Sequence, residues 1–294
     1  MDSKMNGKKQ SLSCELIENF SLSREIFMLE FIWPGPVPMA GQFFMIRPKR
    51  SAVFLGRPLS MENWKPAETD KDYIRKKVRG KKNPYMRYLT RKHLESNIVS
   101  FLIARRGTGT EELSGLQIGE EAELTGPLGN AWSDFSMNDG AVKPIALLGG
   151  GLGIAPLNAL LLEREEGRFE VYAGFKTGFK TEYEKILLAG PSLLYSDKLT
   201  IATEDGKNGN KGQITDFFEP EKYSLVCACG PELMLKAVTK KCMSAGVPCL
   251  ICIERRMACG VGACLGCTVK TVQGNLRCCA DGPIFKAEEV IFED

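Results

Sequence analysis

Residues 144–156, PIALLGGGLGIAP, lead an apolar run directly into a turn that contains four glycines. Residues 144–148 predict a buried strand, and residues 157–166 predict a helix. A glycine-rich turn between a strand and a helix lets the pyrophosphate of a dinucleotide approach backbone N–H groups at the helix start. Tight packing of the strand on the helix would favour the same glycines, so the turn alone leaves both interpretations open.

The residues after this turn alternate apolar runs with an amphipathic segment. Strands are predicted at residues 169–173, 199–202 and 223–228, and a helix at residues 231–245. Alternating strands and helices predict a doubly wound, mostly parallel α/β sheet, which we assign to residues 140–248. Residues 145–162 carry no charge, but their glycines, Pro156 and Asn158 argue against a lipid-facing helix.

Residues 10–135 have a different texture, with short apolar runs separated by glycine and proline. The runs at residues 26–32, 42–46, 98–103 and 121–124 predict the strands of a β-barrel or sandwich. Within them, residues 64–97 hold eleven Lys and Arg against four Asp and Glu. We interpret this basic segment, which includes the only histidine, His93, as a surface insertion; a docking patch for an acidic partner is the alternative.

Length and composition set the class of the protein. The 294 residues suffice for two domains and a small appendage, and 44% hydrophobic with 26% charged residues is typical of a globular protein. A net charge of +3 gives no strong field toward nucleic acid or anionic lipid. The first twenty residues lack the apolar run of an export signal, so we expect a cytoplasmic protein with neither nucleic acid nor a membrane as partner.

Cysteines are concentrated near the end of the chain, in residues 249–294, a segment too short for a conventional core. Cys259, Cys264 and Cys267 have the spacing C-x4-C-x2-C, and Cys278 and Cys279 follow. This spacing is typical of plant-type 2Fe–2S proteins, and interleaved glycines let a loop wrap closely around a cluster. A structural zinc site is the alternative, although zinc ligands usually come as two tight pairs.

Spacing does not decide which of Cys278 and Cys279 is the fourth ligand. Neighbouring side chains in an extended segment point to opposite sides, so only one of the two should face a cluster. Other cysteines lie in apolar runs or are scattered, and we expect them to be small buried hydrophobes. These are Cys14, Cys227, Cys242, Cys249 and Cys252.

Several motifs, in this order, resemble the ferredoxin reductase family: RPLS at residues 57–60, GTGT at 107–110, GPLG at 126–129, the glycine-rich turn, and CGP at 229–231. The resemblance implies a flavin-binding β-barrel followed by a nicotinamide nucleotide domain. Residues 254–267, ERRMACGVGACLGC, and residues 279–285, CADGPIF, are similar to one branch of that family, the electron-transfer subunits of dihydroorotate dehydrogenase B.

This resemblance implies a set of site residues. Flavin contacts carry over onto Arg57, Pro58, Leu59, Ser60, Leu102, Ile103, Ala104, Gly109 and Thr110. Nucleotide contacts carry over onto Gly149, Gly150, Gly151, Gly153 and Cys229, and cluster ligands onto Cys259, Cys264, Cys267 and Cys279. The family usually has an arginine where Ala104 stands, and Arg105 and Arg106 follow directly.

The resemblance also implies a function in pyrimidine biosynthesis, with FAD, a 2Fe–2S cluster and NAD as cofactors. Electrons from dihydroorotate oxidation on a partner subunit's FMN would reach NAD+ in a heterotetramer. A related NAD(P)H reductase subunit coupled to ferredoxin or sulfur metabolism is the alternative, and a zinc-stabilised binding protein is another. Glu204 and Asp205 would suit NAD, whereas Lys176 and Lys180 would suit a 2′-phosphate.

Overall fold

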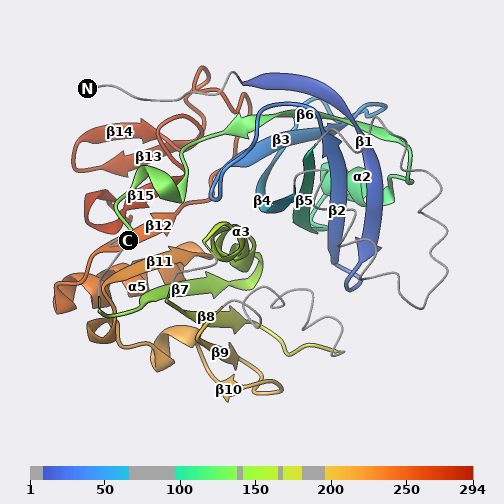
Figure 1. Cartoon of the computed structure of the whole chain (residues 1–294). Helices are drawn as coiled ribbons and strands as arrows, with labels where there is room; N and C mark the ends of the chain where they lie inside the picture. The colour runs from blue at the N-terminus through green and yellow to red at the C-terminus, as the bar shows by residue number, and fades with distance from the viewer. Residues whose placement is uncertain (1–8, 66–96, 138–141, 165–167, 181–195, 294) are drawn as a thin grey trace.

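The computed structural model describes residues 9–65, 97–137, 142–164, 168–180 and 196–293. Most of the predicted basic insertion, residues 66–96 with His93, lies outside the described residues. Figure 1 shows a barrel beside a sheet, with the C-terminal segment against both. This arrangement confirms the predicted fold class, a β-barrel followed by a doubly wound α/β domain and a small cysteine-rich segment.

The barrel is closed by antiparallel pairing in the order β1-β2-β5-β4-β3-β6. Its strands are β1 (Gln10–Ser21), β2 (Ile26–Trp33), β3 (Phe43–Pro48), β4 (Arg57–Lys65), β5 (Asn97–Ala104) and β6 (Glu121–Leu128), and the short helix α2 (Thr108–Gly115) follows β5. Inside, Phe44 packs edge-on against Trp33 and Phe101, with ring centroids 5.0 and 5.5 Å apart. Closure leaves no unpaired strand edge, and the aromatic interior fixes the side of each strand that faces inward.

The second layer is a seven-stranded sheet in the order β10-β9-β8-β7-β11-β12-β15, parallel except at β15. Its strands are β7 (Ile145–Gly150), β8 (Phe169–Phe175), β9 (Lys198–Thr203), β10 (Asn210–Lys211), β11 (Leu225–Cys229), β12 (Cys249–Cys252) and β15 (Ile284–Lys286). The helices are α3 (Ala155–Glu163) and α5 (Glu232–Ala245), with 3-10 turns η3 (Trp132–Asp134), η4 (Gly151–Ile154), η5 (Ile214–Phe217), η6 (Pro220–Lys222) and η7 (Ala287–Glu289).

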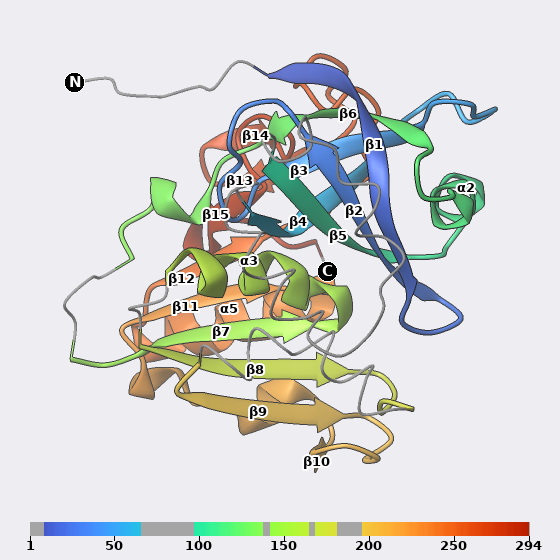
Figure 2. The ribbon, with the colours of Figure 1, turned by 45° about the vertical axis from the view of Figure 1, so that its right-hand side comes forward.

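The strand order reverses between β7 and β11, since the chain proceeds outward from β7 in one direction and from β11 in the other. Right-handed crossovers therefore place α3 and α5 on opposite faces of the sheet, as Figure 2 shows. Helix α3 packs between the sheet and β4 of the barrel. The carboxyl ends of β7 and β11 thus open toward the barrel at the point where a doubly wound sheet binds ligands.

One part of the C-terminal segment belongs to the sheet, and the other part lies outside it. The expected boundary at residue 248 falls just before β12, so β12 and β15 extend the sheet with residues from the cysteine-rich segment. A two-stranded hairpin, β13 (Thr268–Thr271) and β14 (Gly274–Arg277), stands apart from the sheet. No helix in the described ranges is both long and apolar enough to cross a membrane.

Candidate functional site

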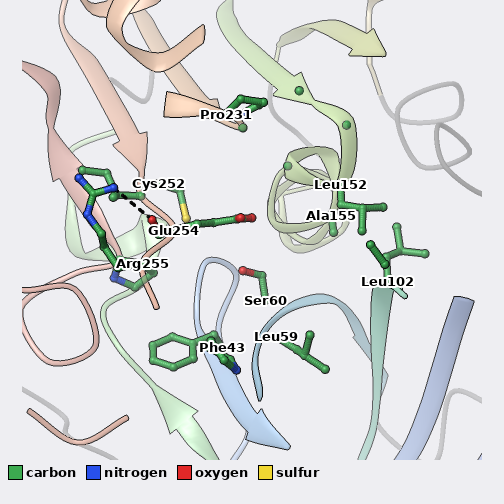
Figure 3. Close-up of a pocket in the computed structure, with 18 of the residues that line it drawn as sticks. Phe43, Leu59, Ser60, Leu102, Leu152, Ala155, Pro231, Cys252, Glu254 and Arg255 are labelled. Carbon is green, nitrogen blue, oxygen red and sulfur yellow. Dashed lines mark hydrogen bonds between the residues drawn. The ribbon is translucent and has the colours of Figure 1, made fainter. Parts of the chain in front are cut away.

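A cavity of about 500 Å³ lies between the barrel and the sheet (Figure 3). Three parts of the chain form its walls: β4 and β5 of the barrel, the glycine-rich turn after β7 with the end of β11, and the segment after β12. Nine of the predicted site residues line it: Pro58, Leu59, Ser60, Leu102, Ile103, Ala104, Gly150, Gly151 and Gly153. The fold therefore brings the predicted flavin and nucleotide residues to one place.

Arg57, Gly109 and Thr110 lie beside the barrel wall and are not among the lining residues. A Cβ atom on Gly109 would stand 2.5 Å from Nε of Arg57, so glycine lets the guanidinium lie against the first turn of α2. The Thr110 hydroxyl accepts the backbone N–H of Arg106 at 2.9 Å and shapes that turn. A cation therefore lies next to a helix N-terminus, and this arrangement favours the binding of a phosphate group.

The two arginines after Ala104 have different surroundings. The Arg105 guanidinium lies 4.5 Å from the ring centroid of Phe27, and its Nε donates to the Ser114 hydroxyl at 3.1 Å. Arg106, in contrast, lines the cavity. The sequence could not distinguish these two neighbours, because the difference depends on which one finds partners on the barrel.

The sheet wall is shaped by backbone rather than by side chains. A Cβ atom on Gly153 would stand 2.2 Å from the carbonyl oxygen of Cys229, so the turn after β7 approaches β11 too closely for any other residue. Gly149 lies within β7, where an added Cβ atom would stand 2.7 Å from Cδ1 of Ile154. Cys229 is 1% exposed, and a hydrogen bond with the Cys252 thiol together with burial raises its pKa well above the usual range.

The third wall comes from residues that the sequence did not single out for the cavity: Cys252, Glu254, Arg255 and Met257. The Glu254 carboxylate reaches into the cavity (Figure 3). Burial between the cavity walls raises the pKa of Glu254, and the positive charge of Arg106 partly opposes that rise. Arg255 is turned to an ion pair with Glu232, 2.7 Å from nitrogen to oxygen. Glu254, Arg255 and Met257 belong to the segment that resembles the cluster-binding branch, but only the packing of β12 against β11 shows that they reach the cavity.

The residues predicted to recognise the ribose follow β9. Asp205 accepts backbone N–H groups from Gly178 and Lys207, both at 3.1 Å, and the bond from Lys207 contributes most to lowering its pKa. The structure therefore uses Asp205 to hold two turns together. Lys176 and Lys180 are exposed.

Four cysteines gather as two pairs in the cysteine loop, which we define as residues 258–267 with 278–281. In the outer pair, the backbone N–H of Cys264 donates to Sγ of Cys259 at 3.4 Å. In the inner pair, the backbone N–H of Cys279 donates to Sγ of Cys267 at 3.4 Å. Cys278 points away, and its thiol donates to the carbonyl oxygen of Ile253 at 3.0 Å.

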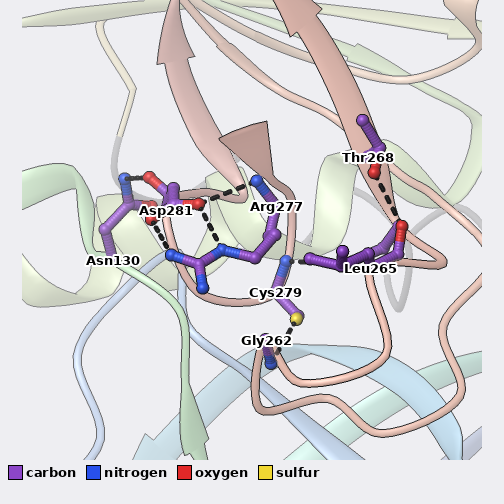
Figure 4. A network of polar contacts seen from close by, with 8 residues as sticks. Asn130, Gly262, Leu265, Thr268, Arg277, Cys279 and Asp281 are labelled. Carbon is purple, nitrogen blue, oxygen red and sulfur yellow. Dashed lines mark hydrogen bonds and ion pairs between the residues drawn. The ribbon is translucent and has the colours of Figure 1, made fainter. Parts of the chain in front are cut away.

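This paired arrangement suits two metal ions better than one. Tetrahedral zinc needs four ligands around one centre, whereas a 2Fe–2S cluster takes two from each side. The N–H of Gly262 donates to Sγ of Cys279 at 3.1 Å (Figure 4), the kind of bond that stabilises a thiolate ligand.

The two pairs differ in exposure and in acidity. Cys267 and Cys279 are buried, whereas Cys259 is half-buried and Cys264 is exposed. Slight burial opposes ionisation of Cys259, but backbone N–H groups, first that of Val261, outweigh it and lower the thiol pKa to about 6. Burial and the bond with Cys267 raise the pKa of the Cys279 thiol to about 12. The Cys259 thiolate is therefore available at neutral pH, while the Cys279 thiol needs a cation nearby to ionise.

The cysteine loop lies directly beside the cavity. Met257 lines the cavity, and Cys259 follows two residues later. Gly260 packs on the barrel, where a Cβ atom would stand 2.5 Å from Cγ of Met45. Since consecutive Cα atoms are about 3.8 Å apart, the first cysteine of the loop is within roughly 8 Å of the cavity wall along the chain.

Comparison with known proteins gives one consistent result. A family model described as the iron-sulfur cluster binding domain of dihydroorotate dehydrogenase B matches residues 254–291. The dihydroorotate dehydrogenase B (NAD(+)) electron transfer subunit of Clostridium perfringens is 36% identical over 94% of this chain and 96% of that protein. The corresponding subunit of Clostridium acetobutylicum is 42% identical over 67% of this chain and 75% of that protein.

Solved structures agree at the level of the fold. The structure of an NADH-dependent reduced ferredoxin-NADP oxidoreductase superposes with a TM-score of 0.72 at 24% identity, covering 98% of this chain and 91% of that one. A ferredoxin NADP+ reductase from Neisseria gonorrhoeae gives a TM-score of 0.57 at 15% identity over 81% of this chain and 93% of that one. With this ferredoxin-reductase fold, near full-length similarity to the Clostridium perfringens subunit and 42% identity to the Clostridium acetobutylicum subunit, the chain belongs to the family of dihydroorotate dehydrogenase B (NAD(+)) electron transfer subunits.

Proposed function

We propose that the chain passes electrons between a catalytic partner subunit, which oxidises dihydroorotate to orotate on its own FMN, and NAD+. The observation that carries this proposal is the adjacency of Met257 in the cavity wall and Cys259 in the cysteine loop. FAD, when bound, exchanges an electron pair with a nicotinamide and single electrons with a 2Fe–2S cluster. The chain's part is to hold these groups close together.

The barrel wall is the proposed FAD site. Arg57 and the first turn of α2, with Gly109 and Thr110, would hold the pyrophosphate through a cation and backbone N–H groups. Pro58, Leu59 and Ser60 with Leu102, Ile103 and Ala104 would enclose the ring system. Arg106 faces the cavity and supplies a positive charge that Ala104 cannot.

The sheet wall is the proposed NAD site. Gly149, Gly150, Gly151 and Gly153 leave the carboxyl end of β7 free of side chains at the point of strand reversal, where a pyrophosphate can approach backbone N–H groups. Cys229 ends the neighbouring strand β11, where it pairs with Gly149 on one side and with Cys252 on the other. The names of the clostridial relatives, which specify NAD(+), favour NAD over NADP.

Cys259, Cys264, Cys267 and Cys279 are the proposed ligands of the 2Fe–2S cluster, two for each iron. The outer pair lies at the surface with Val261 and Leu265, which are 45% and 62% exposed. Apolar side chains around an exposed redox site suit the docking of a partner subunit. We propose this face for the FMN subunit, in a heterotetramer with two copies of each chain.

The decisive experiment is anaerobic purification of the protein with its native partner, followed by measurement of flavin, iron and the visible spectrum. We expect dihydroorotate to bleach flavin and iron–sulfur absorbance, and NAD+ to restore it. A complex that responds to NADH but never to dihydroorotate would instead support a reductase coupled to ferredoxin or sulfur metabolism. A colourless protein that contains zinc would refute both functions.

A further inference from the structure

Arg277 is fixed beside the cysteine loop by a two-pronged ion pair (Figure 4). Its Nε and Nη2 donate to the two carboxylate oxygens of Asp281, each at 2.9 Å. Asp281 also accepts the backbone N–H of Arg277 at 2.8 Å and donates its own N–H to the Arg277 carbonyl at 2.8 Å. The turn that holds Cys278 and Cys279 is therefore closed by this pair, and the guanidinium has one orientation.

The remaining edge of the guanidinium lies beside Gly262, whose backbone N–H is hydrogen-bonded to the inner cysteine pair. Nη1 of Arg277 is 3.4 Å from the point where a Cβ atom on Gly262 would stand, and the N–H of Gly262 donates to Sγ of Cys279.

The ion pair acts as an oriented dipole rather than as a neutral unit. Asp281 binds the Nε and Nη2 edge, so its negative charge lies on the side of Arg277 away from Nη1. The positive end lies beside Gly262, whose N–H donates to Sγ of Cys279. The Arg277 side chain is 42% exposed, so water screens part of its charge, while the thiols of Cys267 and Cys279 are buried. Cys259 and Cys264 lie nearer the surface, where water screens the same field.

We propose that Arg277, held by Asp281, raises the reduction potential of the cluster by stabilising added negative charge on the iron bound to Cys267 and Cys279. This inference rests on the proposed function, since it needs a cluster on these cysteines. Cluster potentials depend on net charge and on hydrogen bonds to the sulfur atoms, and a fixed guanidinium changes the first without being a ligand. Arg277 is thus a positioning and electrostatic residue, not a ligand.

The test is a redox titration of the cluster, monitored by electron paramagnetic resonance, in the complex with its partner subunit. We expect Arg277→Gln to lower the one-electron equilibrium constant for reduction about tenfold, which corresponds to about 59 mV. Arg277→Lys, which keeps the charge, should retain most of the potential. Lys270→Gln is the matched control, because Lys270 lies on the same hairpin, is 59% exposed and pairs with Glu293 instead.

Equal potentials in Arg277→Gln and Lys270→Gln would overturn the inference, and so would an Arg277→Lys potential as low as that of Arg277→Gln. Arg277→Met keeps the aliphatic stem against Gly262 and measures the same shift if the glutamine variant loses its cluster. Iron and the reduced-cluster signal in the unsubstituted complex separate the two proposals. Their absence there refutes the proposed function, whereas their presence with an unchanged Arg277→Gln potential refutes only this inference.

Discussion

The sheet and the cysteine loop are neighbours that are stabilised in different ways. Every residue of β7 is buried, and β8 and β11 flank it with further apolar side chains. In the cysteine loop, Val261 and Leu265 are exposed, and the ordering contacts are N–H to sulfur bonds and one Arg–Asp pair. The sheet has a hydrophobic core of its own, whereas the loop depends on what its thiols bind.

Because of this difference, the stability of the fold and the content of bound cluster should respond to different substitutions. Apolar burial acts without any ligand, so substitutions in the sheet should change the free energy of unfolding. Metal–thiolate bonds act only when the metal is present, so substitutions of loop ligands should change cluster content first. The following predictions test that separation, beginning with the largest effect.

Replacement of a loop ligand should abolish the cluster. Cys279→Ser removes the thiol that bonds with Cys267 and accepts the N–H of Gly262, and we expect loss of essentially all iron and of the iron–sulfur absorbance. Cys278→Ser is the matched control. Its hydroxyl can still donate to the carbonyl oxygen of Ile253, so iron content should stay at the unsubstituted level.

The ratio of iron to flavin, measured on both purified variants, shows which of Cys278 and Cys279 is the fourth ligand. Full iron in Cys279→Ser with none in Cys278→Ser would reverse the assignment of the fourth ligand. Loss of flavin along with iron in Cys279→Ser would show that the cysteine loop and the barrel wall are not independent. It would contradict the view that the loop and the rest of the fold are stabilised in different ways.

In the sheet, Gly153→Ala should lower the free energy of unfolding by about 3 kcal/mol. The added methyl would stand 2.2 Å from the Cys229 carbonyl oxygen, so β7 and β11 would have to separate. Gly115→Ala, where nothing lies within 4 Å, should show no loss. Urea unfolding followed by circular dichroism measures both, and an equal midpoint for the two variants would contradict the close approach seen here.

The sequence predicted the sheet and the barrel well because their patterns are local. The apolar run at residues 26–32 corresponds to β2, and residues 144–148 correspond to β7 but for one residue at the start and two at the end. The expectation that Cys14 and Cys227 are buried hydrophobes was also confirmed. Each of these features depends on residues that are close in the chain.

The cavity could be predicted only in part, because it is assembled from distant segments. The motifs supplied Ser60 and Gly153 as site residues, whereas neither Arg106 nor Glu254 was predicted to line the cavity. Glu254 lines the cavity only because β12 pairs with β11 and carries the following segment over the site. Spacing likewise left Cys278 and Cys279 equivalent, and the family resemblance implied Cys279; in the structure their hydrogen bonds to Ile253 and Gly262 distinguish their surroundings.

The attachment of the C-terminal segment to the barrel should show an intermediate effect. Asn130 donates to the carbonyl oxygens of Asp281 and Ile284 at 3.3 and 2.8 Å and accepts the N–H of Ile284 at 3.0 Å. Asn130→Ala leaves these groups without their partner and should cost about 2 kcal/mol in urea unfolding. Asn210→Ala, which removes one exposed bond at 3.2 Å, should cost a few tenths of that. Equal costs would mean that the segment is held by its strand pairing alone.

The smallest effect is expected at an ion pair on the barrel surface, the counterpart of Arg277 and Asp281. Arg47 Nη2 lies 2.6 Å from Glu123 Oε2, and this bond holds the pKa of Glu123 below its usual value. A lowered pKa in the folded state means that the pair stabilises the fold above the ordinary carboxyl pKa and loses its effect as pH falls through the lowered value. Because both side chains are about a third or more exposed, solvent screening limits the effect to about 0.5 kcal/mol.

Glu123→Gln should therefore be less stable than the unsubstituted protein by about 0.5 kcal/mol near pH 7, with the difference shrinking toward about pH 4. Paired urea titrations at both pH values measure it, and addition of salt should reduce it further. A loss as large as that of Asn130→Ala, or one that grows as pH falls, would contradict this assignment. It would also weaken the distinction between the Arg47–Glu123 pair on the barrel, held by one hydrogen bond, and the Arg277–Asp281 pair, which is held by two side-chain bonds.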